Sequence, residues 1–149
     1  MDISTRFATM EDESWILEQS ADFAKTYPSK LNLAENLPYM KLLFKNLIEN
    51  HVMIIAEMAG TRTGFIAGMK APHHFNPNLT VLSELLWWVP EEFRGSKAGS
   101  ALLEDFIAVG KGSADWITFT IEEQTPISDK SLIKRGFRPT EKSYLLEVR

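Results

Sequence analysis

The chain has 149 residues, no cysteine, 44% hydrophobic residues and a net charge of −4. This length suits one domain that buries roughly 70% of its unfolded surface, and the apolar content excludes an intrinsically disordered chain. The lack of cysteine excludes disulfides, thiolate metal ligands and a cysteine nucleophile, while the negative charge gives no basis for non-specific nucleic-acid binding. No apolar run approaches the ~20 residues of a membrane span and the first residues do not resemble a signal peptide, so we predict a cytoplasmic protein without a membrane partner.

The first third of the chain reads as a strand followed by two helices. Residues 3–8 alternate apolar and polar side chains, as a half-buried strand does. Thr9, followed by acidic residues, has the pattern of a helix cap, and the helix that it starts is broken at residues 27–30. Pro38 fits the first turn of a second helix, whose apolar stripe over residues 40–48 is typical of core packing.

Strand patterns dominate the middle and the end of the chain. Residues 51–58 and 63–69 form a predicted hairpin, in which Gly64 and Gly68 indicate bulges or the close approach of another backbone. The remaining predicted elements are a central strand over 82–89, a helix from 98 to 109, a strand over 116–121, a short helix over 128–135 and a last strand over 143–148. The order β-α-α-β-β-β-α-β-α-β predicts one mixed α/β (α+β) domain.

A loop of small residues follows the central strand and leads into the long helix. We call it the cradle, and its residues are Arg94, Gly95, Ser96, Lys97, Ala98, Gly99 and Ser100. A helix start carries unpaired N–H groups and partial positive charge, so it binds anions, and small residues let a phosphate approach the backbone. This pattern predicts a diphosphate site; the alternative is an ordinary strand-to-helix turn whose small residues only pack.

Arg94-x-x-Lys97-x-Gly99 resembles the Arg/Gln-x-x-Gly-x-Gly/Ala signature of the GNAT superfamily of acyl-CoA-dependent N-acyltransferases. The order of elements resembles the GNAT fold from end to end, and Gly136-Phe137 resembles the Gly-Phe pair that follows the last helix of that family. The sequence departs from the signature at Lys97, where glycine is usual, and a residue other than glycine disfavours a positive φ in the loop.

The resemblance implies that acetyl-CoA is the co-substrate. Its diphosphate would bind the backbone amides of residues 95–100, and its pantetheine arm would enter where the central strand and the strand over 116–121 splay apart. Main-chain groups of Trp87 and Val89 would pair with the pantetheine amides, and an N–H near Val89 would polarise the thioester carbonyl. Trp87 and Trp88 point to opposite faces of a strand, so one would pack in the core and the other would line the cleft.

Glu84 is the only carboxylate inside the apolar central strand, and alternation predicts that it shares a face with Leu86 and Trp88. A lysine-like amine has a pKa about three units above neutral, so its deprotonation costs roughly 4 kcal/mol and a nearby base would lower that barrier. In many enzymes of the family that the chain resembles, a glutamate at or near this position is assigned the role of that base. The alternative is a solvated or ion-paired glutamate near the start of the strand.

The chain departs from the resembled family at the position of the general acid. Many members of the resembled family have a tyrosine four residues before the glycine of the Gly-Phe pair, where this chain has Leu132. Tyr144 on the predicted last strand is a substitute candidate, with a half-buried aromatic role as the alternative. His73 and His74 are adjacent in a loop without other metal-ligating residues, so we predict loop structure or acceptor contact and no metal site.

The sequence therefore predicts an N-acetyltransferase that acts on a primary amine of a small molecule or of a protein. The alternative is a module on the same fold that binds acyl-CoA or another protein without catalysis, which Lys97 and Leu132 favour. The acceptor is open, and so is a homodimer, which many proteins of the resembled family form.

Overall fold

The computed structural model describes residues 2–27, 29–122 and 129–149. Its strands are β1 (Ile3–Phe7), β2 (Val52–Met58), β3 (Thr61–Pro72), β4 (Thr80–Trp88) and β5 (Trp116–Thr118). Its helices are α1 (Glu13–Ala24), α2 (Leu37–Asn50), α3 (Ala98–Ser113) and α4 (Lys130–Ile133), with short 3₁₀ turns η1 (Met10–Asp12) and η2 (Glu91–Phe93). Among the described residues, no helix combines the length and the apolar character needed to cross a membrane.

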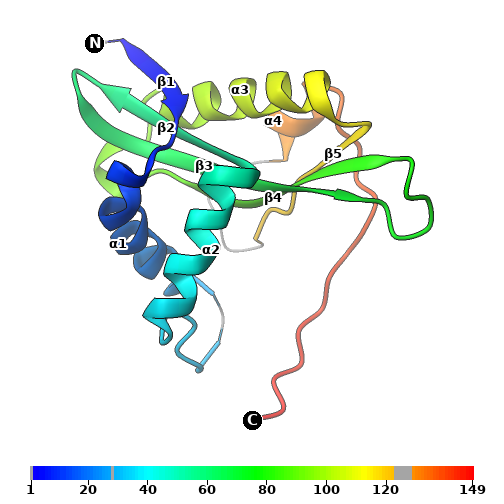
Figure 1. Cartoon of the computed structure of the whole chain (residues 1–149), viewed down its shortest axis with the longest axis horizontal. Coiled ribbons are helices and arrows are strands. Elements are labelled where there is room, and N and C mark those ends of the chain that lie inside the picture. Colours follow the sequence, from blue (N-terminus) through cyan, green and yellow to red (C-terminus); the bar gives the residue numbers. More distant parts are fainter. Residues whose placement is uncertain (1, 28, 123–128) are drawn as a thin grey trace.

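The five strands form one sheet in the order β1-β2-β3-β4-β5 (Figure 1). Neighbours are antiparallel from β1 to β4, and β4 and β5 are parallel, so the sheet is mixed. A parallel pair needs a crossover connection, and α3 is the helix that links β4 to β5. The predicted fold class is confirmed.

The sheet lies between two helical layers, with α1 and α2 on one face and α3 on the other (Figure 1). Residues on β2 alternate between these layers: Met53 and Ile55 pack with Phe44 of α2, whereas Ile54 packs with Phe106 of α3. Both faces of the central strands are therefore buried, which explains the nearly continuous apolar runs in the sequence.

The two glycines of β3 mark close approaches, as the sequence indicates. A Cβ atom on Gly68 would lie 2.5 Å from the Cζ atom of Phe106, and one on Gly64 would lie 2.9 Å from the carbonyl oxygen of Trp88. Real Cβ contacts are essentially never that short, so these positions require glycine. The ring of Phe106 is thus seated directly on the backbone of β3.

A bulge in β4 changes the predicted orientation of Glu84. Ala67 pairs with Leu86, but the next residue, Gly68, pairs with Glu84, so Leu85 is an extra residue without a partner on β3. Directly opposed residues point to the same face, and the Cα of Gly68 faces α3. Glu84 therefore lies on the α3 face of the sheet. The prediction that it shares a face with Leu86 and Trp88 is wrong, because alternation assumes an uninterrupted strand.

The predicted last strand over residues 143–148 is also wrong. The segment 138–149 has no regular secondary structure and runs away from the sheet in Figure 1. Its apolar alternation is a local property, whereas a strand also needs a neighbouring edge with which to pair. The strand predicted over 116–121 is shorter than expected, since β5 ends at Thr118. The predicted helix over 128–135 is observed as α4, and Ser128 lies outside the described residues.

Candidate active site

The pairing between β4 and β5 stops close to Glu84. Only Val81, Leu82 and Ser83 of β4 pair with β5. From Glu84 onward, β4 has no strand beside it on that side within the described part of the chain. Backbone N–H and C=O groups along this edge are therefore available to an extended ligand that carries amides. This is the separation of strands that the sequence resemblance implies.

Glu84 lies at the point where the two strands separate. One of its carboxylate oxygens accepts a hydrogen bond from the backbone N–H of Thr120, with a nitrogen–oxygen distance of 3.3 Å. Within the described residues, no cation forms an ion pair with Glu84. Burial raises the pKa of Glu84 to about 7, the Thr120 hydrogen bond opposes the increase and the charge of Glu122 adds to it. At neutral pH the carboxyl group can therefore both accept and release a proton.

Tyr27 is a site residue that the sequence did not reveal. Burial, together with the charges of Glu122 and Glu84, raises the pKa of Tyr27, so its hydroxyl keeps its proton at neutral pH. Its ring packs edge-on against Phe23 of α1 with 5.5 Å between centroids, and Phe23 packs in the same way on Trp88 at 5.7 Å. In the sequence, Tyr27 is only an aromatic residue at the end of a helix, and Glu122 belongs to no pattern. The fold alone brings them to Glu84.

The backbone of the cradle accommodates Lys97 and leaves open space beside Gly99. The backbone of Lys97 has a φ of −84°, which any residue adopts, and it is the N-cap of α3. The residue with a positive φ, +86°, is Gly95. A Cβ atom on Gly99 would have one neighbour within 4 Å, at 3.8 Å, so the space beside the first turn is open. The lysine therefore causes no backbone strain, and its exposed side chain adds positive charge.

Arg94 is engaged with β4 rather than free in solvent. Its guanidinium carbon lies 4.9 Å from the ring centroid of Trp88, and its Nε donates a hydrogen bond of 3.0 Å to the carbonyl oxygen of Val89. The sequence resemblance assigns the main-chain groups of Val89 to pantetheine. A pantetheine amide that pairs with this carbonyl would have to replace Arg94, which would then be free to bind a phosphate.

The two tryptophans at the end of β4 lie on opposite faces, as predicted. The indole Nε1 of Trp87 donates to the carbonyl oxygen of Gly99 at 3.3 Å, which ties the first turn of α3 to the sheet. The indole Nε1 of Trp88 donates to Oε1 of Gln19 on α1 at 2.8 Å. Trp87 therefore holds the cradle against the strand, while Trp88 belongs to the α1 side of the molecule.

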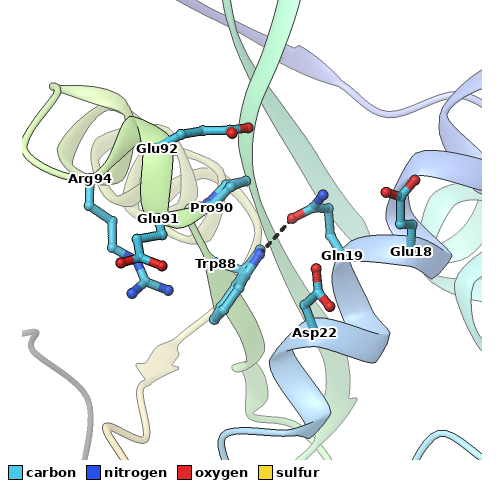
Figure 2. A pocket seen from close by; sticks show the side chains of 8 residues that line it. All are labelled: Glu18, Gln19, Asp22, Trp88, Pro90, Glu91, Glu92 and Arg94. Atoms are coloured by element: carbon cyan, nitrogen blue, oxygen red, sulfur yellow. Dashed lines mark hydrogen bonds between the residues drawn. The ribbon is translucent and has the colours of Figure 1, made fainter.

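Trp88 also lines a pocket of about 420 Å³ between α1 and the loop that follows β4 (Figure 2). The pocket is lined by Glu18, Gln19, Asp22, Trp88, Pro90, Glu91, Glu92 and Arg94. Four carboxylates and one guanidinium give it a net negative charge at neutral pH. Such a pocket attracts cations and disfavours anionic ligands.

The residues considered for the general acid do not reach Glu84. Tyr144 lies on the exposed segment 138–149, with 90% of its surface accessible. Leu132 is buried against Leu103 and Ile107, where it serves as a core residue. In the part of the chain that the structure describes, the tyrosine near Glu84 is Tyr27.

His73 and His74 have a structural arrangement. Their rings stack with 4.5 Å between centroids, and Nδ1 of His73 accepts a hydrogen bond from the backbone N–H of Phe75. Among the residues that the structure describes, no group of three or more His, Cys, Asp or Glu side chains could hold a metal ion. The pair orders the loop between β3 and β4.

No family model and no curated protein matches the sequence. Solved structures match it over its whole length. A protein of Bacillus halodurans C-125 described as a transcriptional regulator has a TM-score of 0.76 at 18% identity, covering 98% of this chain and 99% of that one. The ribosomal-protein-alanine N-acetyltransferase of Brucella melitensis biovar Abortus 2308 has a TM-score of 0.75 at 14% identity, with 99% of both chains covered. The chain has the GNAT fold.

A third solved structure bears on the co-substrate. The predicted acetyltransferase of Clostridium acetobutylicum, solved with acetyl-CoA, has a TM-score of 0.74 at 16% identity and covers 99% of this chain and 97% of its own. Identities this low show a shared fold only. The family resemblance in the sequence is thus confirmed at the level of fold, while activity and acceptor have to be argued from the residues of the site.

Proposed function

We propose that the protein is a cytoplasmic N-acetyltransferase that transfers an acetyl group from acetyl-CoA to a primary amine. The observation that carries this proposal is Glu84, a carboxyl group without a cationic partner among the described residues, which burial gives a pKa of about 7 at the unpaired edge of β4. A general base works best when its pKa is close to the working pH. Most isolated surface glutamates lack this property.

In this mechanism Glu84 removes a proton from the ammonium form of the acceptor, directly or through a water molecule. The amine nitrogen then attacks the thioester carbonyl carbon, and a backbone N–H near Val89 stabilises the charge that develops on the carbonyl oxygen. The carbon–sulfur bond breaks, the new amide nitrogen releases its second proton, and CoA leaves as a thiolate that takes up that proton through the solvent. The thiol of CoA has a pKa not far above neutral, so this last step works without a dedicated acid.

The cradle supports acetyl-CoA as the donor. Its first-turn amides lie beside the open space at Gly99, and Lys97 adds charge to the same end of α3. The diphosphate would accept hydrogen bonds from the backbone N–H groups of residues 95–100, with Arg94 as a mobile cation. The pantetheine arm would lie along the free edge of β4, with Trp87 behind it and the Val89 carbonyl as a partner.

The acidic pocket supports an acceptor that arrives with a positive charge. Glu18 and Asp22 reach it from α1, and Glu91 and Glu92 reach it from the loop after β4 (Figure 2). A protonated amine would be attracted to this pocket, which lies on the α1 side. Trp88 of the pocket packs on Phe23, Phe23 packs on Tyr27, and Tyr27 lies near Glu84, so this row of aromatic residues would connect the pocket with the base. Both a small polyamine-like molecule and an exposed protein amino group meet this requirement.

Two measurements, made one after the other, test the proposal. Acetyl-CoA should raise the melting temperature of the protein, because a ligand that binds the native state stabilises it by mass action. Gly99→Trp, which fills the space beside the amides, should abolish that shift, whereas the control Gly112→Trp, at a position with no neighbour within 4 Å near the end of α3, should keep it.

A panel of amines assayed for CoA release then separates an enzyme from a binding module. We expect turnover with at least one cationic amine. Acetyl-CoA binding without turnover on any small amine or lysine peptide would favour the module, and no binding at millimolar acetyl-CoA would end both interpretations.

A further inference from the structure

Arg94 lies where the cradle meets the end of β4. It directly precedes Gly95, whose φ of +86° turns the chain toward the first turn of α3. Its side chain contacts β4 instead of that turn. The guanidinium carbon lies 4.9 Å from the ring centroid of Trp88 (Figure 2), and Nε donates a 3.0 Å hydrogen bond to the carbonyl oxygen of Val89. The backbone of Arg94 thus belongs to the cradle, while its side chain covers the end of the strand.

The carbonyl group that Arg94 occupies lies on the free edge of β4. Carbonyl groups of successive residues in an extended chain point to opposite sides, and the carbonyl oxygen of Trp88 lies beside β3, 2.9 Å from where a Cβ atom of Gly64 would be. The carbonyl of Val89 therefore points away from β3. On that side β4 has no neighbouring strand beyond Ser83 within the described residues. A ligand that lays its amides along this edge needs the Val89 carbonyl as a hydrogen-bond acceptor.

Both partners of the Arg94 side chain are neutral. The side chain is exposed, and among the described residues no carboxylate forms an ion pair with its guanidinium. A phosphate carries the opposite charge and accepts two parallel hydrogen bonds from a guanidinium, so it binds arginine more strongly than one carbonyl and the face of a ring do. A diphosphate in the adjacent cradle can therefore draw the guanidinium away from β4. A neutral ligand offers it no replacement.

We infer that Arg94 selects the donor: its side chain covers the Val89 carbonyl until a diphosphate binds the guanidinium, so the protein accepts acetyl-CoA and disfavours a thioester of pantetheine alone. The inference rests on the proposed acetyltransferase function and adds a residue that determines donor specificity. S-acetylpantetheine has the same thioester and the same amides as acetyl-CoA but no phosphate. It has to displace Arg94 from Val89 and Trp88 without compensation.

Arg94→Met tests the inference with these two ligands. Methionine can still cover the ring of Trp88, but it cannot donate a hydrogen bond to Val89 or bind a phosphate. In calorimetry we expect the variant to bind acetyl-CoA roughly 10-fold more weakly than the unmodified protein, because a charge-assisted contact is lost. We expect it to bind S-acetylpantetheine about 2–10-fold more tightly, the ratio that corresponds to one net hydrogen bond. A residue that only bound phosphate, or only supported the fold, would not produce this gain.

Lys97→Met is the matched control. It removes a positive charge from the same loop and leaves the hydrogen bond between Arg94 and Val89 in place, so it should weaken acetyl-CoA binding without a gain for S-acetylpantetheine. If Arg94→Met binds S-acetylpantetheine no better than the unmodified protein does, or if Lys97→Met shows an equal gain, the inference is wrong and the proposed function still stands. An unmodified protein that binds no acetyl-CoA at millimolar concentration would overturn the proposed function, and the inference with it.

Discussion

Asp12 and Glu84 are both largely shielded from water, but they have different hydrogen-bond partners. The carboxylate of Asp12 is fully buried and accepts hydrogen bonds from Arg6, Arg62 and the backbone N–H of Thr9, each at 2.8 Å. Glu84 has one backbone N–H at 3.3 Å and another carboxylate, Glu122, for a neighbour.

Burial acts on the pKa of both carboxyl groups, and hydrogen bonds outweigh it only at Asp12. Burial favours the neutral form of a carboxyl group and would raise the pKa of Asp12 as it raises that of Glu84. At Asp12, the hydrogen bonds from Arg6, Thr9 and Arg62 reverse the effect and hold the pKa well below its usual range. At Glu84 the hydrogen bond from Thr120 is too weak to offset burial, so the pKa of Glu84 stays raised. Asp12 links β1, η1 and β3 through its ion pairs. Glu84 can exchange protons near neutral pH.

The largest effect that we expect comes from removing the basic group of Glu84. Glu84→Gln keeps the size of the side chain and can still accept the hydrogen bond from Thr120. It should lower turnover at pH 7 by roughly 10²–10⁴-fold, the usual contribution of a general base. The deficit should shrink as pH approaches the pKa of the acceptor amine, where the amine is deprotonated without assistance. Steady-state kinetics across pH measure both effects.

Acetyl-CoA affinity serves as the control for that variant. The cradle is on α3 and the loop before it, so calorimetry should give the same dissociation constant for Glu84→Gln as for the unmodified protein. A variant that binds acetyl-CoA normally and turns over at the unmodified rate at pH 7 would exclude Glu84 as the base. The difference between Glu84 and Asp12 would then have no catalytic consequence.

Asp12→Asn should reduce stability without a specific effect on catalysis. It removes the charge that two guanidinium groups share; since both guanidinium groups are about a third exposed and stay solvated, we expect a loss of about 1–3 kcal/mol. Urea denaturation should show this loss in the free energy of unfolding. The turnover of the molecules that stay folded should be unchanged, because Asp12 lies at the β1–α1 connection. Glu11→Gln, one residue earlier on an exposed position, should change stability little.

The two acids should also give opposite pH dependences of stability. An unfolded glutamate has a pKa near 4.3, so between about pH 4.5 and 7 the native protein holds a proton at Glu84 that the unfolded chain has lost. Stability should therefore fall as pH rises through this window, by about 3 kcal/mol for this shift. Asp12, with a lowered pKa, stabilises the native state above the pKa of unfolded aspartate and loses this contribution as pH falls below it.

Unfolding measured from pH 4.5 to 8 in the unmodified protein and in Glu84→Gln isolates the first contribution. The variant should lack the decline between pH 4.5 and 7, and above pH 7 it should be the more stable protein. Parallel curves for the two proteins would show that Glu84 titrates as an ordinary surface acid.

Local patterns in the sequence predict several features of this site. The sequence indicates bulges or close approaches at Gly64 and Gly68, of which the structure shows close approaches, and it marks Glu84 as the acid within an apolar strand. Its orientation could not be predicted, because the extra residue Leu85 shifts the alternation and nothing local marks that bulge. The segment 143–148 was assigned to a strand for a related reason: its pattern describes the segment alone, and pairing depends on a distant edge.

Tyr27 and Glu122 were missed because their significance is purely spatial. Tyr27 is 57 residues before Glu84 in the sequence and Glu122 is 38 residues after it, whereas in the fold the charges of Glu84 and Glu122 act on the hydroxyl of Tyr27. A helix end, a central strand and the segment after β5 converge at this point. Such convergence depends on the register of the sheet and on the length of α1, which no short pattern encodes.

The smallest effect that we expect comes from Glu122, and it tests whether a neighbouring charge helps to set the pKa of Glu84. The Glu122 carboxylate disfavours ionisation of Glu84, so Glu122→Gln should lower the pKa of Glu84. Glu84 would then become a base at lower pH, and the acidic limb of the pH profile of kcat/KM should move to lower pH by less than about one unit. Glu49→Gln, on the exposed end of α2, removes an equal charge away from the site and should leave the profile in place. A limb that does not move with Glu122→Gln would mean that burial alone sets the pKa, and a limb that moves equally with Glu49→Gln would mean that the net charge of the whole protein does.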